Sequence, residues 1–322
     1  MNQKLTGKQY TLLASMLFGM FFGAGNLIFP IILGAKAGAS LVPALLGMLI
    51  TAVGMPLLGI VALGVSRSSG LMQMSGRVAK WYSYFFTCAL YLTIGPFFAI
   101  PRCAATSFTM GIAPLVSGSH TVPQAIFTTL FFAAVLFFAL RPNNIMNSIG
   151  KYLNPIFLIC LGILVVAALL DPIQSVGSVA ASGAYADNAF STGFLQGYDT
   201  LDALASLAFG IIVVNVIKEM GVEEPGAIAK NTIKSGVFSM VLMTVIYALI
   251  AIVGAQSYGL YADQLGEPSF NGGNAFAIVA QHYLGKAGMI VLALTVTFCC
   301  MKTAIGLVTA CADTFSVMFP RS

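Results

Sequence analysis

The stretch Phe21-Phe22-Gly23-Ala24-Gly25-Asn26-Leu27-Ile28-Phe29-Pro30 lies in an apolar run that carries no charge from position 9 to position 35. This run exceeds the about 20 residues that a helix needs to cross a bilayer. Two glycines, an asparagine and a proline close together disfavour a continuous helix. Unwound backbone at membrane depth is tolerated only where it is buried in protein or lines a cavity. The stretch therefore predicts a membrane helix that is interrupted at Gly23-Ala24-Gly25-Asn26.

The two ends of such an interruption differ in electrical character. Free N–H groups on one half-helix attract a carboxylate, and free C=O groups on the other attract a cation or an ammonium group. This arrangement suits an amino acid bound together with Na⁺. The alternative interpretation is close helix packing through small residues, because Gly19 with Gly23 and Gly34 with Gly38 both form GxxxG patterns.

The composition indicates that the bilayer is the solvent for most of the chain. Of its 322 residues, 58% are hydrophobic and 8% are charged, whereas a soluble domain has about 25% charged residues. The six cysteines all lie in apolar runs and are interpreted as packing residues. Sequence motifs of zinc proteases, nucleotide-binding loops and dinucleotide-binding enzymes are absent, which argues against an enzyme.

The spacing of charges predicts an all-α, polytopic membrane helix bundle that forms one domain over residues 1–322. Stretches of spanning length between charges and turn residues give eight helices. We expect them near residues 10–34, 41–66, 81–110, 124–140, 152–170, 198–217, 235–257 and 287–318.

Basic residues predict a cytoplasmic N-terminus. With that orientation the inner segments hold most of the lysines and arginines, as the positive-inside rule requires. The net charge of +5 follows from this asymmetry and does not indicate nucleic-acid binding. The first apolar run is too long for a signal peptide and is expected to stay as a span. The basic residues assigned to the inner side are Lys4, Lys8, Arg67, Arg77, Lys80, Arg141, Lys151, Lys218, Lys230, Lys234 and Arg321.

The segment near 198–217 predicts a second part of a binding site. It is short between charges and contains Asp202, Ser206 and Gly210. A pair of short or glycine-interrupted helices at matching positions in two halves of a chain points to the binding site of a carrier. Alternatively, Asp199 and Asp202 suit the first turn of an interfacial helix, where the helix dipole favours negative charge.

Two cations also lie within predicted helices. Arg102 follows two prolines that should kink its helix, and it could guide a carboxylate, brace the bundle or snorkel to the outer interface. Lys302 lies near the middle of the last helix, where an ionisable residue usually faces a cavity or a partner. It could pair with Asp202 or act as a tethered cation in place of a bound ion. Thr303 could offer its hydroxyl to Na⁺, although threonine more often bonds a carbonyl of its own helix.

Several runs together resemble the bacterial branched-chain amino acid:cation symporters, also called branched-chain amino acid transport system II carrier proteins. The resemblance covers nearly the whole chain in order. The runs that carry it are 22–30 (FGAGNLIFP), 51–59 (TAVGMPLLG), 95–102 (GPFFAIPR) with 107–108 and 111–114, 197–204 (GYDTLDAL) with 209–215, and 302–310 (KTAIGLVTA).

The resemblance implies a five-plus-five inverted-repeat (LeuT-like) transporter fold in the bacterial cytoplasmic membrane. It also implies import of leucine, isoleucine and valine by symport with Na⁺. The family has about twelve helices, so eight of them would be present, the second repeat would be incomplete and the chain would be C-terminally truncated. We expect no catalytic residue and no cofactor besides the coupling ion, with the amino acid, Na⁺ and membrane lipid as partners.

The resemblance and the residue patterns also assign roles. Asn26 and Thr303 are the expected Na⁺ ligands, and Lys302 is a possible coupling residue. Rival hypotheses are a proton-coupled carrier in which Lys302 titrates, and a non-transporting sensor or assembly subunit. The residues expected to bind substrate are Gly23, Ala24, Gly25, Phe97, Arg102, Asp202, Ser206, Phe209 and Gly210.

Overall fold

The computed structural model describes residues 5–66, 68, 70–116, 118–140, 146–267 and 270–320. Every secondary-structure element in these ranges is a helix, and loops connect the helices. Short π-helical turns interrupt several of the helices, as at Ile50–Gly54 and Thr93–Phe97. The α-helices are α1 Gly7–Phe21, α2 Ala24–Ala37, α3 Leu41–Leu49, α4 Met55–Ser66, α5 Leu71–Ser75, α6 Lys80–Leu92, α7 Ala99–Ser107, α8 Thr121–Ala139, α9 Asn154–Leu170, α10 Ala184–Tyr198, α11 Asp202–Glu219, α12 Pro225–Gln256 and α13 Gly272–Met318.

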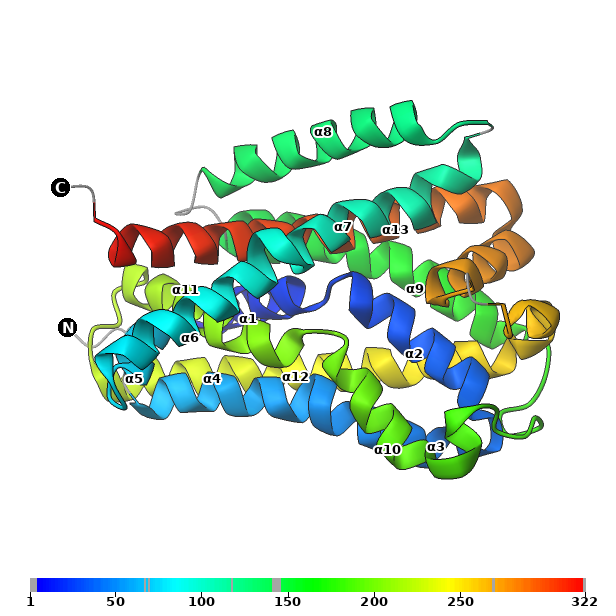
Figure 1. Cartoon of the computed structure of the whole chain (residues 1–322), viewed down its shortest axis with the longest axis horizontal. Coiled ribbons are helices and arrows are strands. Elements are labelled where there is room, and N and C mark those ends of the chain that lie inside the picture. Colours follow the sequence, from blue (N-terminus) through cyan, green and yellow to red (C-terminus); the bar gives the residue numbers. More distant parts are fainter. Residues whose placement is uncertain are drawn as a thin grey trace.

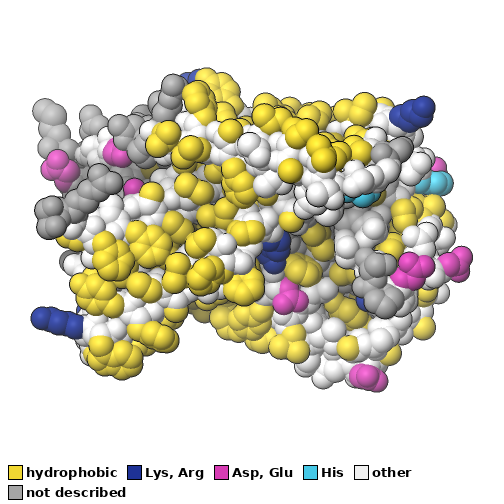
Figure 2. Space-filling model, turned by 45° about the horizontal axis from the view of Figure 1, so that its top comes forward, with side chains coloured by type: hydrophobic (Ala, Val, Ile, Leu, Met, Phe, Trp, Pro, Cys, Tyr) yellow, Lys and Arg dark blue, Asp and Glu magenta, His cyan; other side chains and the backbone are white. Residues whose placement is uncertain are grey.

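Length and composition confirm a polytopic membrane bundle. Among the described residues, six helical segments are long and apolar enough to cross a membrane, or up to seven if α10 and α11, bent by 42°, count as one span. Hydrophobic side chains dominate the face in Figure 2, and most charged side chains on it lie toward the two ends of the long axis. The number of eight spans stays a prediction.

Most predicted helices are present, but several boundaries are wrong. The segment expected at 198–217 begins at Asp202, because residues 199–201 break the helix. The region 171–197, expected as a loop, contains α10. Gly285, with a non-helical φ of +55°, divides α13, so the part after Gly285 begins close to the expected residue 287, and the helical part that starts at Gly272 was not expected.

The helices run along the long axis of the molecule (Figure 1). α13 packs on α9 and α7, α12 packs on α2 and α4, and α10 packs on α3. Figure 1 places the N-terminus, α5 and the α11–α12 connection at the same end of the molecule. This placement agrees with the prediction that the basic residues of these segments lie on the same side of the membrane. Of the basic residues expected there, Lys4, Arg67, Arg141 and Arg321 lie outside the described residues.

Close backbone contacts fix α2 against α12. A Cβ atom at Gly34 would lie 1.9 Å from the carbonyl oxygen of Ala251, and one at Gly254 would lie 2.1 Å from that of Ile31. Small residues therefore do serve packing here, as in other membrane helix pairs. Gly38 has another role, since its φ of +49° forms the turn at which the chain reverses from α2 toward α3 (Figure 1).

Replacing Gly254 with alanine should destabilise the protein, because α2 and α12 would have to separate. Overpacking of this kind costs typically about 1–3 kcal/mol. We expect the midpoint of thermal unfolding in detergent micelles to fall by roughly 2–4 °C or more. Gly162→Ala is the matched control, since a Cβ atom there meets nothing within 4 Å. Equal midpoints for the two variants would contradict the proposed tight contact.

Candidate functional site

The first interruption separates α1 from α2 at Phe22 and Gly23. The backbone N–H of Gly23 donates to Oδ1 of Asn26 at 2.9 Å, so the asparagine caps the start of α2. This bond fixes the side chain of Asn26, which is only 1% exposed, and turns its amide Nδ2 toward the second interruption. The helix break predicted at Gly23-Ala24-Gly25-Asn26 is therefore present, with its actual discontinuity at Phe22-Gly23.

Three buried side chains from α2, α11 and α12 join the two interruptions. Asn26 Nδ2 donates to Oδ2 of Asp202 at 2.6 Å, and the Tyr247 hydroxyl donates to the same oxygen at 3.1 Å. Asn26 Nδ2 also donates to the hydroxyl oxygen of Tyr247. Each of the three residues is at most 3% exposed. We call Asn26, Asp202 and Tyr247 the polar triad.

The second interruption lies between α10 and α11. Leu201 there has a φ of +67°, a conformation that costs energy for a residue with a side chain. Arg102 on α7 spans this break, because its two terminal nitrogens donate to the carbonyl oxygens of Asp199 at 2.9 Å and Thr200 at 3.1 Å. The guanidinium thus satisfies carbonyls left free at the C-terminal end of α10. This geometry fits a bracing role better than snorkelling.

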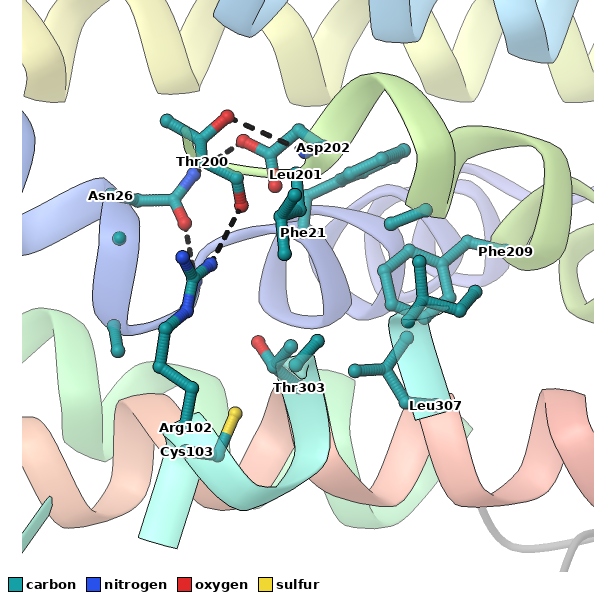
Figure 3. A pocket seen from close by; sticks show the side chains of 16 residues that line it. Phe21, Asn26, Arg102, Cys103, Thr200, Leu201, Asp202, Phe209, Thr303 and Leu307 are labelled. Atoms are coloured by element: carbon teal, nitrogen blue, oxygen red, sulfur yellow. Dashed lines mark hydrogen bonds between the residues drawn. The ribbon is translucent and has the colours of Figure 1, made fainter. Parts of the chain in front are cut away.

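A small cavity lies between the two interruptions (Figure 3). Figure 3 shows Asn26, Thr200, Asp202 and Arg102 grouped on one side and Phe209 and Leu307 on the other. The space that the centre of a water molecule can reach is only about 20 Å³. One water molecule or a bare cation needs about that much, and a leucine needs far more. The cavity is therefore closed around its polar groups and must widen to take an amino acid.

The structure brings most of the predicted site residues to this cavity. Its lining combines the N-terminal turn of α2, the N-terminal half of α11, three residues of α7 and two residues of α13. Predicted residues that line it are Gly23, Ala24, Gly25, Asn26, Arg102, Asp202, Phe209 and Thr303.

Three predicted site residues lie elsewhere. Phe97 is 64% exposed on the surface. Ser206 donates to the carbonyl of Ala203 at 2.7 Å, and both Ser206 and Gly210 face α4. Ala205 and Phe209 on α11 line the cavity, whereas Ser206 and Gly210, each one residue later, are turned by about 100° around the helix axis toward α4.

Thr303 and Lys302 serve two different contacts on α13. The Thr303 hydroxyl donates to the carbonyl oxygen of Met20 at 2.8 Å, which ties α13 to the C-terminal end of α1 instead of to its own helix. Lys302 is fully buried, and its Nζ donates to Oδ1 of Asn154 at 3.0 Å and lies 3.5 Å from the centre of the Phe157 ring. The suggested pair of Lys302 with Asp202 is therefore wrong, because the Lys302 side chain points toward α9 and α1 and not toward Asp202 on α11.

Sequence reasoning missed other residues of the site. Thr200, Leu201 and Cys103 line the cavity, and Tyr247 completes the polar triad. The sequence contains one indication for Tyr247, because a tyrosine inside a long apolar helix needs a partner for its hydroxyl. It contains no indication of the positive φ of Leu201.

No cluster of three or more His, Cys, Asp or Glu side chains that could hold a metal occurs among the described residues. The oxygen atoms at the cavity belong instead to an amide, a carboxylate, two hydroxyls and the freed backbone carbonyls of α1 and α10. Hard monovalent cations bind to such neutral and anionic oxygens. The site can therefore offer a cation ligands without a conventional metal-binding cluster.

Comparison with known proteins identifies the family to which the chain belongs. The model of a family described as branched-chain amino acid transport protein matches residues 6–322. The branched-chain amino acid permease BrnQ of Lactobacillus delbrueckii subsp. lactis is 50% identical over all of this chain and 72% of its own length. BrnQ of Bacillus subtilis is 41% identical, again over all of this chain and 72% of its own length, and BrnQ of Escherichia coli K12 is 37% identical over all of this chain and 71% of its own length. The chain belongs to the family of branched-chain amino acid transport proteins.

Proposed function

We propose that the chain is a secondary carrier that imports leucine, isoleucine and valine together with Na⁺, with its N-terminus on the cytoplasmic side of a bacterial membrane. One observation carries the proposal. Two interrupted helices meet at one closed cavity that contains a buried carboxylate and a guanidinium. The similarity to a family of transport proteins supports a carrier and opposes an enzyme.

The polar side of the cavity matches the head group of an amino acid. The Asp202 carboxylate uses Oδ2 for the triad, and it would attract the substrate ammonium group. The first N–H groups of α2, at Ala24 and Gly25, form a helix N-terminus that favours a carboxylate. Arg102 adds a positive charge on the same side of the cavity.

The other side of the cavity matches a branched aliphatic side chain. Phe209 and Leu307 line it, and Phe21 packs edge-on against Phe209 with ring centroids 5.3 Å apart. Ile94 and Ala205 complete the apolar wall. The small volume means that substrate entry would have to open this wall, which is what alternating access between the two membrane sides requires.

Two groups of oxygen atoms support Na⁺ as the coupling ion. Asn26 Oδ1 accepts one bond from Gly23 and keeps a second acceptor position. Thr303 and the Met20 carbonyl present adjacent oxygens where α1 ends. Coupling to protons is the rival, and Lys302 favours it, since it is buried against Phe157 and Asn154 with no carboxylate partner among the described residues.

Leucine uptake into proteoliposomes tests the proposal directly. An inward Na⁺ gradient should drive accumulation, because the ion and the amino acid would bind at adjoining sites. Replacing external Na⁺ with choline should abolish accumulation even when a proton gradient is imposed. Accumulation driven equally well without Na⁺ would contradict sodium coupling, and no leucine uptake under any gradient would contradict the carrier.

Asn26→Ala should weaken the response to Na⁺. The variant loses the cap at Gly23 and the bond to Asp202, which disorders the break where the ion would bind. We expect the Na⁺ concentration for half-maximal uptake to rise at least about tenfold, which corresponds to about 1.4 kcal/mol. Asn188→Ala is the control, because Asn188 also accepts from a backbone N–H, that of Ser191, but lies exposed on α10. Equal Na⁺ dependence in both variants would make Asn26 a structural residue.

Tyr247→Phe tests the polar triad. The substitution removes one hydrogen bond to a buried carboxylate, worth roughly 1.5–3 kcal/mol. We expect the leucine concentration for half-maximal uptake to rise about tenfold or more. Tyr261→Phe is the control, since its buried hydroxyl bonds the carbonyl of Gly254 away from the cavity. If both variants changed uptake alike, Tyr247 would contribute only to general stability.

A further inference from the structure

A second and larger cavity is lined by residues of α5, α6, α11 and the C-terminal part of α13. Figure 1 shows α5, the start of α6 and the C-terminal part of α13 at the same end of the molecule. Its volume is about 630 Å³, within the range of small-molecule sites in proteins. The site described above does not include it. Its lining contains Gly70, Leu71, Met72, Gln73, Gly76, Lys80, Ser83, Tyr84, Ile211, Asn215, Asp313, Thr314 and Val317.

Three helical segments contribute residues to both cavities. α13 contributes Leu307 to the central cavity and Thr314 to the larger one, and seven helical residues correspond to about 10 Å. α11 contributes Phe209 to the first and Asn215 to the second, again within two turns. The segment from α6 to Phe97 lines both as well.

Side-chain contacts join α13 to α6 at sequence positions between those that line the two cavities. The Cys311 thiol, between Leu307 and Thr314 on α13, contacts the backbone carbonyl of Tyr91 at 3.7 Å. Tyr91 in turn packs edge-on against Phe315. Because the two cavities share these segments, a molecule that moved along α13 and α11 toward this end of the bundle would pass these contacts before it reached the larger cavity.

The chemistry of the larger cavity fits a zwitterion with an apolar side chain. Asp313 on α13 supplies a carboxylate and Lys80 on α6 an ammonium group. Neither charged group has a hydrogen-bond or ion-pair partner within the described ranges of the chain. Leu71, Ile211 and Val317 line the space with aliphatic surface. Opposite charges and an aliphatic wall are the features that a branched-chain amino acid would use.

We propose that this cavity is a second, weaker binding site for the transported amino acid, occupied on its way out of the central cavity toward the cytoplasm. The proposal rests on the proposed function and extends it. It assigns Asp313 to the ammonium group of the amino acid and Lys80 to its carboxylate. A larger volume and more solvent around both charges make this site the weaker of the two, since exposed ion pairs contribute little.

Equilibrium binding of radiolabelled leucine to the purified whole chain in detergent and Na⁺ tests the proposal. We expect two leucine molecules per chain, with clearly separated affinities. Asp313→Asn should lose the weaker component, and Lys80→Gln should weaken it about tenfold. Asp263→Asn, which removes a carboxylate from an exposed loop, should keep both components.

The outcomes separate this proposal from the proposed function. Asp202→Asn should lose the tighter component and keep the weaker one. A single leucine per chain that disappears in Asp202→Asn would leave the carrier standing and overturn the second site, as would two leucines in Asp313→Asn. No leucine bound by the unchanged chain would overturn both. Should Asp313→Asn fold poorly, Lys80→Gln on α6 decides, and unchanged affinity of the weaker component in that variant contradicts the proposal.

Discussion

A carboxylate buried inside a membrane protein is costly unless hydrogen bonds or a cation stabilise its charge, and the bond from Asn26 to Asp202 meets this requirement at the centre of the bundle. The bond also joins the two interrupted helices, because Asn26 caps α2 and Asp202 begins α11. Tyr247 adds a third helix to the contact. Loss of this junction would leave two helix breaks without a common partner, so the shape of the cavity depends on it.

The remaining free ends of the interrupted helices are satisfied from neighbouring helices. Arg102 bonds the last carbonyls of α10, and Thr303 and Cys299 bond carbonyls at the end of α1. Backbone groups freed at membrane depth need such partners, since lipid offers none. At each helix end, a substrate or an ion could take the place of the side chain that now bonds the backbone carbonyl. A protein that stabilises its own breaks in this way keeps them closed when no ligand is present.

Sequence reasoning predicted the helical membrane fold and the first interruption, because glycine, asparagine and proline inside an apolar run have strong local effects. It also predicted that Asp202 and Arg102 belong to the site, since a charged residue in an apolar membrane helix usually faces a cavity or a partner. The exact position of the second break was not predicted, because Leu201 adopts a left-handed conformation that its residue type does not indicate. Ser206 and Gly210 face α4 and not the cavity, because a step of one residue turns a side chain by about 100° around the helix, and the sequence pattern did not show which face of α11 lines the cavity.

The glycine contacts described for α2 and α12 recur between α10 and α3, where a Cβ atom at Gly193 would lie 2.0 Å from the Ala44 carbonyl oxygen. Both half-helices on one side of the interruptions are thus joined, backbone to backbone, to a neighbour. A helix held this closely cannot slide or rotate alone without breaking its contact, because packed helices change between discrete arrangements. A movement of α2 that widens the cavity would therefore carry α12 with it, and a movement of α10 would carry α3, so these four helices would move as two coupled pairs.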